Sequence, residues 1–238
     1  MPYFYYGFDS TYLILVLPVL ILSLIASLRV KSTFNKYATQ LSSRGITGAQ
    51  AAQRVLLANG ITNVRIEHTS GSLTDHYDPR SNVIRLSDPV FNSTSTAAIG
   101  VACHEAGHAV QYAQNYRPVK LRAAIIPITN IGSNLAMPFI LIGLVITNLS
   151  GLSTFFIYLG IACFSLSLIF QLVTLPVEFN ASRRAIQVID KMDILNDDEL
   201  IGAKKTLRAA AMTYVMATIA ALTQLLRLFL LFGRRRRN

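Results

Sequence analysis

Four long apolar stretches constrain this chain more than any other feature of its sequence. A helix needs about 20 mostly apolar residues to cross the hydrocarbon core of a bilayer. Stretches of this kind cover residues 12–28, 125–149, 152–177 and 209–232. Because 52% of the residues are hydrophobic and only 14% are charged, a soluble domain is a poor fit. We therefore expect a mainly α membrane protein with three to four transmembrane helices.

The basic residues predict the topology of these helices. The formal net charge is +10, and Lys and Arg cluster beside the apolar stretches rather than among aromatic residues. This is typical of the positive-inside rule and does not indicate a nucleic-acid partner. The rule places residues 1–10 outside, makes residues 29–122 cytoplasmic, and turns the second and third stretches into a hairpin. We expect a multi-pass protein of a bacterial plasma membrane, with the lipid bilayer as its main contact.

The fourth stretch conflicts with this scheme, because crossing would put the basic residues 234–237 outside. About 18 residues, or roughly 27 Å of helix, separate Arg208 from Arg227, which is barely enough to span. The segment either crosses against the rule, lies on the membrane or re-enters it. The sequence leaves these three alternatives open.

The region between the first two stretches predicts a small α+β part. Thr47 and Gln50 form a capping box that begins a helix, which ends at Asn59 and Gly60. Residues 64–68 and 83–86 alternate like strands, with turn residues at 79–82. Asn92 or Ser93 is expected to cap the next helix, which runs to about Ala113.

That last helix carries the residues that predict chemistry. In CHEAGHAV, His104 and His108 lie four residues apart, so both imidazoles leave one face of the helix and can share a zinc ion. Glu105 lies beside them, where its carboxylate can take a proton from a water without binding the metal. Chance produces this pattern in roughly one per cent of chains of this length. We therefore predict one Zn²⁺ per chain and a catalytic base at Glu105.

A catalytic zinc normally has three protein ligands, so a third is needed. His68 and His76 are the other histidines, but Glu178 is the better candidate. It closes the third apolar stretch, and the hairpin returns it to the side that carries His104. The alternative is an interfacial glutamate that reaches water or pairs with Arg183 or Arg184.

Three segments together resemble a known family. LTDHYDPRSNVIRLS, ACHEAGHAVQ and, after the hairpin, LPVEFNASRRA are similar to the neutral zinc metallopeptidases of the YugP type, whose layout is related to HtpX-like and CAAX prenyl proteases. The resemblance implies a gluzincin-like zinc peptidase domain. In the related proteases a Glu-x-x-Ala-Asp signature follows the hairpin, and here Glu178 opens it while Ser182 replaces the Asp. Asn180, Ser182 or Arg183 could then orient a ligand instead.

His76, Tyr77 and Cys103 are further candidates for the site. His76 or Tyr77 could stabilise the oxyanion of a tetrahedral intermediate, although both also fit an exposed strand end and turn. Cys103 adjoins His104, but one helical step of about 100° turns it away from the metal. We interpret Cys103 as a buried small hydrophobic residue.

These elements predict five segments along the chain. They are a transmembrane anchor (1–30), a cytoplasmic α+β part with the zinc helix (31–122), a transmembrane hairpin (123–177), a cytoplasmic helical segment with the third ligand (178–208), and a C-terminal apolar helix with a basic tail (209–238). The domain organisation places the active site at the cytoplasmic membrane surface.

The predicted function is hydrolysis of peptide bonds in membrane or juxtamembrane substrates. A second hypothesis is hydrolysis of a lipid amide or ester, because a zinc site does not by itself select the acyl group. A third is a membrane scaffold with a structural zinc, for which a fourth protein ligand would be expected. We expect an exposed sheet edge at residues 83–86 if the substrate is a peptide. A membrane-protein partner or a homo-oligomer is left open.

Overall fold

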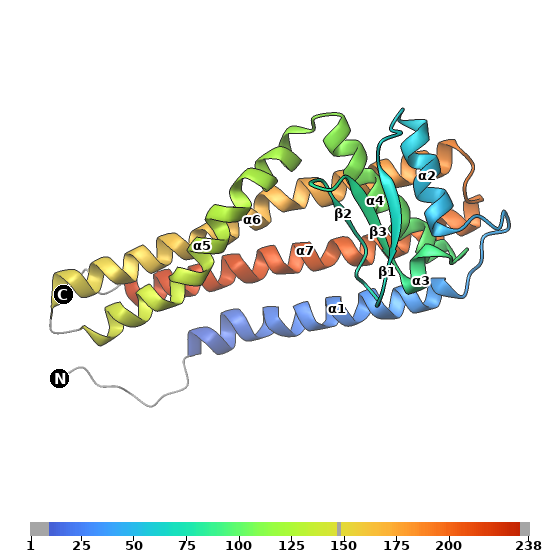
Figure 1. The fold of residues 1–238 in the computed structure, drawn as a ribbon. Coiled ribbons are helices and arrows are strands. Elements are labelled where there is room, and N and C mark those ends of the chain that lie inside the picture. Colours follow the sequence, from blue (N-terminus) through green and yellow to red (C-terminus); the bar gives the residue numbers. More distant parts are fainter. Residues whose placement is uncertain (1–9, 147–148, 234–238) are drawn as a thin grey trace. The chain divides into compact units, whose positions relative to one another are not determined.

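The computed structural model describes residues 10–146 and 149–233. Its elements in chain order are the π-helical turn η1 (Tyr12–Val16), α1 (Leu17–Ala38), α2 (Gly48–Ala58), β1 (Arg65–Thr69), β2 (His76–Asp78), β3 (Val83–Ser87), α3 (Asp88–Phe91), α4 (Thr96–Ala113), α5 (Arg117–Val145), α6 (Ser150–Lys191) and α7 (Asp197–Phe232) (Figure 1). The predicted location of residues 1–9 and of the basic tail 234–237 lies outside the described residues.

The chain forms two compact units. The helical unit comprises residues 1–25, 122–173 and 214–238, and the sheet-containing unit comprises residues 26–121 and 174–213. Helices α1, α6 and α7 therefore each contribute one part to each unit, and α5 lies almost entirely in the helical unit. The five segments predicted from the sequence remain a prediction.

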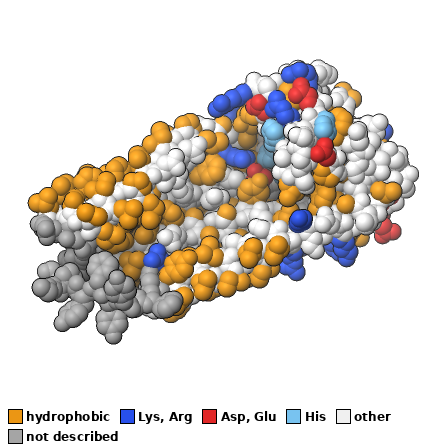
Figure 2. Space-filling view, turned by 60° about the horizontal axis from the view of Figure 1, so that its bottom comes forward, with side chains coloured by type: hydrophobic (Ala, Val, Ile, Leu, Met, Phe, Trp, Pro, Cys, Tyr) orange, Lys and Arg blue, Asp and Glu red, His pale blue; other side chains and the backbone are white. Residues whose placement is uncertain are grey.

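Within residues 10–146 and 149–233, four helices are long and apolar enough to cross a membrane: Tyr12–Ala38, Arg117–Val145, Gly151–Lys191 and Asp197–Phe232. Figure 2 shows many hydrophobic side chains exposed on the visible surface. Exposed apolar side chains on long helices are stable against lipid but costly against water. The expected fold class, a mainly α membrane protein with a small α+β part, is confirmed.

The length of α7 removes one objection to its crossing. The sequence estimate counted only the residues between Arg208 and Arg227, but the helix runs without a break over 36 residues. Its first 12 residues include six charged ones, so the apolar part is residues 209–232, which at 1.5 Å per residue is about 36 Å and still exceeds the ~30 Å hydrocarbon core. Crossing, lying on the membrane and re-entering it thus remain the three alternatives for α7.

Within the helical unit, α5 and α6 pack closely through glycines. A Cβ on Gly143 would lie 2.7 Å from the carbonyl oxygen of Ser153, and one on Gly160 would lie 2.7 Å from that of Ala136. The Ser153 hydroxyl also donates to the Gly143 carbonyl. Small residues allow such close backbone approach where lipid supplies no hydrophobic driving force between helices. The two helices therefore form a tight hairpin.

The sheet has the strand order β1-β3-β2. β1 and β3 are parallel, with a register that runs from Arg65 opposite Val83 to Thr69 opposite Ser87. β2 and β3 are antiparallel. Two strands agree with the sequence prediction to within one residue, whereas β2 was read as a strand end and turn. Residues 83–86 are not the exposed sheet edge that would favour a peptide substrate, because β3 is the central strand. Its buried Val83, Ile84 and Leu86 fit that position.

The cap predicted for the histidine helix is also wrong. Asn92 ends the short helix α3, and the Ser93 hydroxyl accepts from the Ser95 backbone N–H. Ser95 is the residue that caps α4, with its hydroxyl accepting from the Ala98 N–H. A cap requires an extended backbone, which Ser95 adopts at the true start of the helix. The Thr47 capping box of α2 is present as predicted.

Helix α4 is the centre of the sheet-containing unit. It contributes Ala98, Ile99, Ala102, Cys103 and Ala106 to one hydrophobic core. Its glycines allow neighbouring helices to approach: a Cβ on Gly100 would lie 3.3 Å from Ala203 of α7, and one on Gly107 would lie 2.6 Å from the Ala181 carbonyl of α6. The histidine helix is therefore held between two long helices.

Candidate metal centre

Three side chains meet between α4 and α6. Glu178 Oε2 lies 3.3 Å from His104 Nε2 and 3.6 Å from His108 Nε2. One ligand atom from each of the three lies within 4.8 Å of the others. Glu178 is 2% exposed and the histidines are partly buried. Residues separated by about 70 positions thus converge on one point.

This geometry fits a zinc ion. Two ligand atoms bound to tetrahedral zinc at 2.0–2.1 Å lie about 3.4 Å apart. The two distances from Glu178 Oε2 to the imidazole nitrogens match that separation, and two imidazoles with one carboxylate are a donor set that zinc accepts in catalytic sites. Among the described residues the group contains three such side chains. A catalytic site keeps one further position open, whereas a structural site normally fills all four with protein ligands.

Gln111 fixes the orientation of His108. Its side chain is fully buried, and its Nε2 donates to the Val177 carbonyl at 2.8 Å and to Asn180 Oδ1 at 3.0 Å. Its Oε1 therefore faces His108 Nδ1, at 3.0 Å, and accepts the proton there. The opposite nitrogen, Nε2, is then free of hydrogen and suited to bind a metal. Gln111 was not predicted from the sequence, although it lies three residues after His108.

Ser182 holds His104 in the same way. The Ser182 hydroxyl lies 3.1 Å from His104 Nδ1 and can accept its proton, which again directs Nε2 towards Glu178. A serine thus occupies the place of the acid in the related signature and contacts the histidine directly. A neutral oxygen is a weaker acceptor than a carboxylate.

A second layer of contacts supports these partners. Asn180 Oδ1 accepts from Gln111 and, at 2.7 Å, from Arg184 Nε. The Arg184 guanidinium also donates to Gln114 and lies over the ring of Tyr116. Of the three residues considered for orienting a ligand, Ser182 and Asn180 belong to this network. Arg183 is exposed, and the guanidinium comes from Arg184 instead.

Glu105 and Cys103 differ although each adjoins His104. Glu105 is 9% exposed, and its negative charge lies near enough to His108 to raise the pKa of that imidazole. Cys103 is fully buried in the core, and this burial raises the pKa of its thiol. The thiol therefore stays protonated and faces away from the ligands, as interpreted from the sequence.

The remaining histidines and Tyr77 lie outside the cluster of ligands. His68 contacts Asp88 at 2.6 Å, and His76 Nδ1 contacts the Thr74 carbonyl at 2.8 Å. The Tyr77 hydroxyl donates to Asn82 at 2.7 Å, while its ring packs edge-on against Tyr112 of the histidine helix. Tyr77 thus attaches β2 to α4, and the group of three ligand side chains among the described residues does not include His76.

The fold and this centre define a class: membrane proteins in which two histidines and a glutamate form a group that can hold a metal ion. Comparison with known proteins agrees. The model of the family described as "Putative neutral zinc metallopeptidase" matches residues 12–233. The chain is 44% identical over 221 residues to a protein of Bacillus subtilis (strain 168) named "Putative membrane protease YugP", covering 93% of this chain and 96% of that protein. The chain belongs to this family. No solved structure matches it.

Proposed function

We propose that this chain is a zinc metalloendopeptidase that cleaves peptide bonds of membrane or juxtamembrane substrates. The observation that carries the proposal is the convergence of His104, His108 and Glu178 beside the carboxylate of Glu105. Family membership supports zinc peptidase chemistry. The open fourth position expected of such a site favours catalysis over a scaffold role.

Each side chain has a distinct role in the proposal. His104, His108 and Glu178 hold the metal, which supplies Lewis acidity to a water and to the scissile carbonyl. Glu105 accepts a proton from the attacking water and then gives it to the nitrogen of the leaving amine. Gln111 and Ser182 keep the two imidazoles in the tautomer that can bind the metal.

The sheet supports a peptide as the substrate. β2 is an edge strand of the sheet, and Tyr77 packs it against the histidine helix through Tyr112. An extended peptide can add to such an edge by main-chain hydrogen bonds. The edge strand that packs on the histidine helix is β2, so residues 83–86 do not meet the condition set for a peptide and a different strand does.

The location of the site is part of the proposal. Glu178 follows directly on the apolar residues 152–177, and Lys120 lies four residues after Tyr116, close behind the histidine helix. The basic residues beside these segments favour the cytoplasmic side. We propose a multi-pass protein of a bacterial plasma membrane, with the active site at the cytoplasmic surface. A polypeptide substrate that emerges from the bilayer reaches the site without being extracted.

The test measures zinc and cleavage separately. Purified wild type should hold one zinc per chain and cleave a membrane-tethered peptide reporter. Glu178→Ala should lose the zinc, whereas Glu105→Gln should keep it and lose cleavage by at least 100-fold, the usual contribution of a general base. Glu67→Gln, the same change at a surface ion pair, is the control and should leave both unchanged.

Two results would contradict the proposal. Full cleavage by Glu105→Gln would reject the base. Zinc binding with cleavage of a lipid ester or amide, but of no peptide, would assign the site to a lipid hydrolase instead.

A further inference from the structure

A basic groove lies in the sheet-containing unit, apart from the metal ligands. It has a volume of about 490 Å³ and runs between α1 and α7. Four cationic side chains line it, Arg29 and Lys36 from α1 and Lys205 and Arg208 from α7, and Ser32 and Thr33 add hydroxyl groups. None of the described residues that line it is acidic. The volume is within the range of small-molecule sites, which is 300–1,000 Å³.

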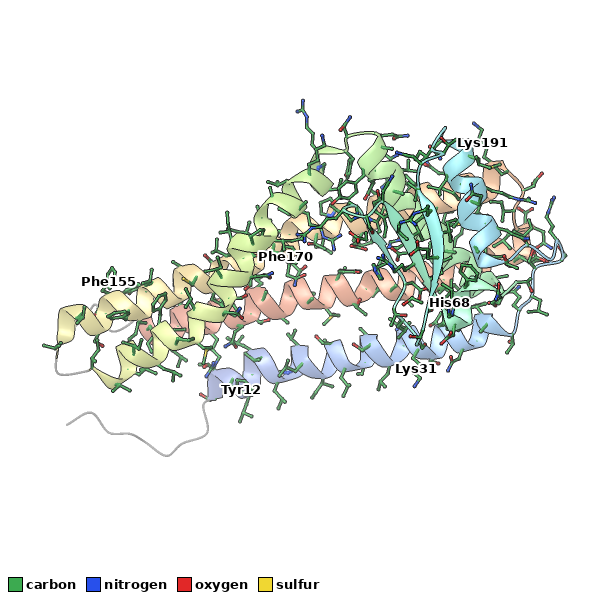
Figure 3. All side chains as sticks on the ribbon, in the orientation of Figure 1. Tyr12, Lys31, His68, Phe155, Phe170 and Lys191 are labelled. Atoms are coloured by element: carbon green, nitrogen blue, oxygen red, sulfur yellow. The ribbon has the colours of Figure 1, made fainter. Side chains whose placement is uncertain are left out.

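The helical period explains how the groove forms. Arg29, Ser32, Thr33 and Lys36 occupy positions i, i+3, i+4 and i+7 of α1, so they share one face. Lys205 and Arg208 are likewise three residues apart on α7. Lys31 falls on the opposite side of α1 by the same geometry and projects from that helix in Figure 3. The spacing of these residues therefore places the groove charges on one face of each helix.

The four charges face one another across the groove without an acid between them. In the part of the chain that the structure describes, the ion pairs involve none of these four residues. Like charges brought together destabilise the fold unless an anion is present. Guanidinium and ammonium groups with adjacent hydroxyls are the donors that bind phosphate.

The position of the groove along α1 and α7 indicates that the phosphate belongs to a lipid. Arg29 directly follows an apolar segment whose side chains Leu24, Ile25 and Leu28 are 60%, 49% and 60% exposed. Arg208 directly precedes the apolar part of α7, where Met212 is 42% exposed and also lines the groove. On both helices the groove thus lies where exposed apolar surface meets polar surface. Basic pockets between helices at this boundary suit lipid headgroups.

We propose that the groove binds the headgroup phosphate of an anionic glycerophospholipid, with the acyl chains against the exposed apolar surface of α1 and α7. Arg29, Lys36, Lys205 and Arg208 neutralise the phosphate, and Ser32 and Thr33 donate to its oxygens. The site is independent of the metal centre. A bound lipid joins α1 to α7 and fixes the depth of the sheet-containing unit at the membrane surface.

The test titrates the full-length protein in detergent with short-chain lipids and follows the melting temperature. Dioctanoyl phosphatidylglycerol should raise it, while dioctanoyl phosphatidylcholine should not. Lys36→Gln combined with Lys205→Gln should weaken phosphatidylglycerol binding by about 30-fold, from the contribution of two lysines near an anionic surface. Lys31→Gln combined with Lys204→Gln removes the same charge outside the groove and should bind as wild type.

The outcomes separate the possibilities. Equal weakening in both double variants would show a general charge effect and overturn the proposal. An equal shift with inorganic phosphate at the same concentration would show a free phosphate site and overturn the lipid assignment. If the double variant of the groove has a lower melting temperature without lipid, Arg29→Lys gives a second comparison. This change keeps the charge and removes the guanidinium fork, so phosphatidylglycerol should bind a few-fold more weakly. Binding equal to wild type in Arg29→Lys and in the groove double variant would overturn the proposal.

Discussion

Gly107, between the two histidines of α4, lies directly against the Ala181 carbonyl of α6, at a distance that leaves no room for a side chain. A Cβ there would be 2.6 Å from the carbonyl oxygen. Because Glu178 is less than one turn from Ala181, this contact sets how closely the glutamate approaches the histidines. The glycine of the motif therefore has a structural role in the centre.

Gly107→Ala should separate the two helices and weaken zinc binding. Overpacking of this kind costs about 1–3 kcal/mol of stability. We expect zinc affinity to fall at least ten-fold, measured by competition with a chromophoric chelator. Gly151→Ala is the matched control in α6, because nothing lies within 4 Å of the added Cβ. Unchanged zinc affinity in Gly107→Ala would show that the contact is not required.

Gln111→Ala should lower zinc affinity about 10- to 100-fold, the usual effect of removing the partner of a metal-binding histidine. The substitution leaves His108 without an acceptor for its Nδ1 proton. Gln187→Ala, an exposed glutamine on α6, is the control. Equal zinc affinity in both variants would contradict the role of Gln111.

Ser182→Ala and Ser182→Asp should act in opposite directions. Alanine removes the acceptor for His104 Nδ1, so zinc affinity should fall about ten-fold. Aspartate supplies a charged acceptor, which forms a stronger hydrogen bond, so affinity should equal or exceed that of wild type. The pair separates a positioning role from a simple packing defect, which would weaken both.

Zinc binding should weaken with acid from a higher pH than an ordinary histidine would require. In the metal-free protein the pKa of His108 is raised above its ordinary 6.5: burial lowers it, but the hydrogen bond to Glu178 and the charges of Glu105 and Glu178 outweigh burial. Protons therefore compete with zinc already above pH 6.5. Zinc affinity measured from pH 5 to 8 tests this.

The metal-free fold should show the opposite pH dependence. Protonated His108 contributes stability that is fully present below pH 6.5 and is lost as the pH rises through the raised pKa. Glu178→Gln removes the charged partner and should flatten this dependence. Urea unfolding of the metal-free protein across the same pH range checks the prediction.

Cys103 should resist alkylation in the folded protein. In a Cys163→Ser background its thiol is the only one in the chain, and burial both excludes the reagent and raises the thiol pKa. Iodoacetamide should label it only after unfolding, at the same rate with and without zinc. Zinc-dependent protection would instead place the thiol beside the metal.

The sequence predicted the parts of this molecule that depend on local pattern. Helical spacing aligned His104 and His108, apolar length identified the membrane helices, and the capping box marked the start of α2. Glu178 was reached only by combining the hairpin with the positive-inside rule. The structure brings it to the histidines.

The remaining features depend on tertiary contacts that no local pattern encodes. β2 has only three residues, and pairing with β3 makes it a strand. Ser95 was missed as a cap because α3 takes up the residues before it. The sequence does not distinguish Gln111 from Gln114, three residues further on, until α6 supplies the Val177 carbonyl that Gln111 binds.

The three ligands of the centre are separated in the sequence by the α5–α6 hairpin. The two histidines are synthesised before it and the glutamate after it. When only the residues before the hairpin have left the ribosome, the nascent chain has two of the three ligands. Two imidazoles alone bind zinc weakly. The proposed hydrolytic centre is therefore complete only when the residues after the hairpin have also been made and have folded back against α4. In the proposed peptidase, this order of synthesis would delay activity in the way that a propeptide does in a soluble protease.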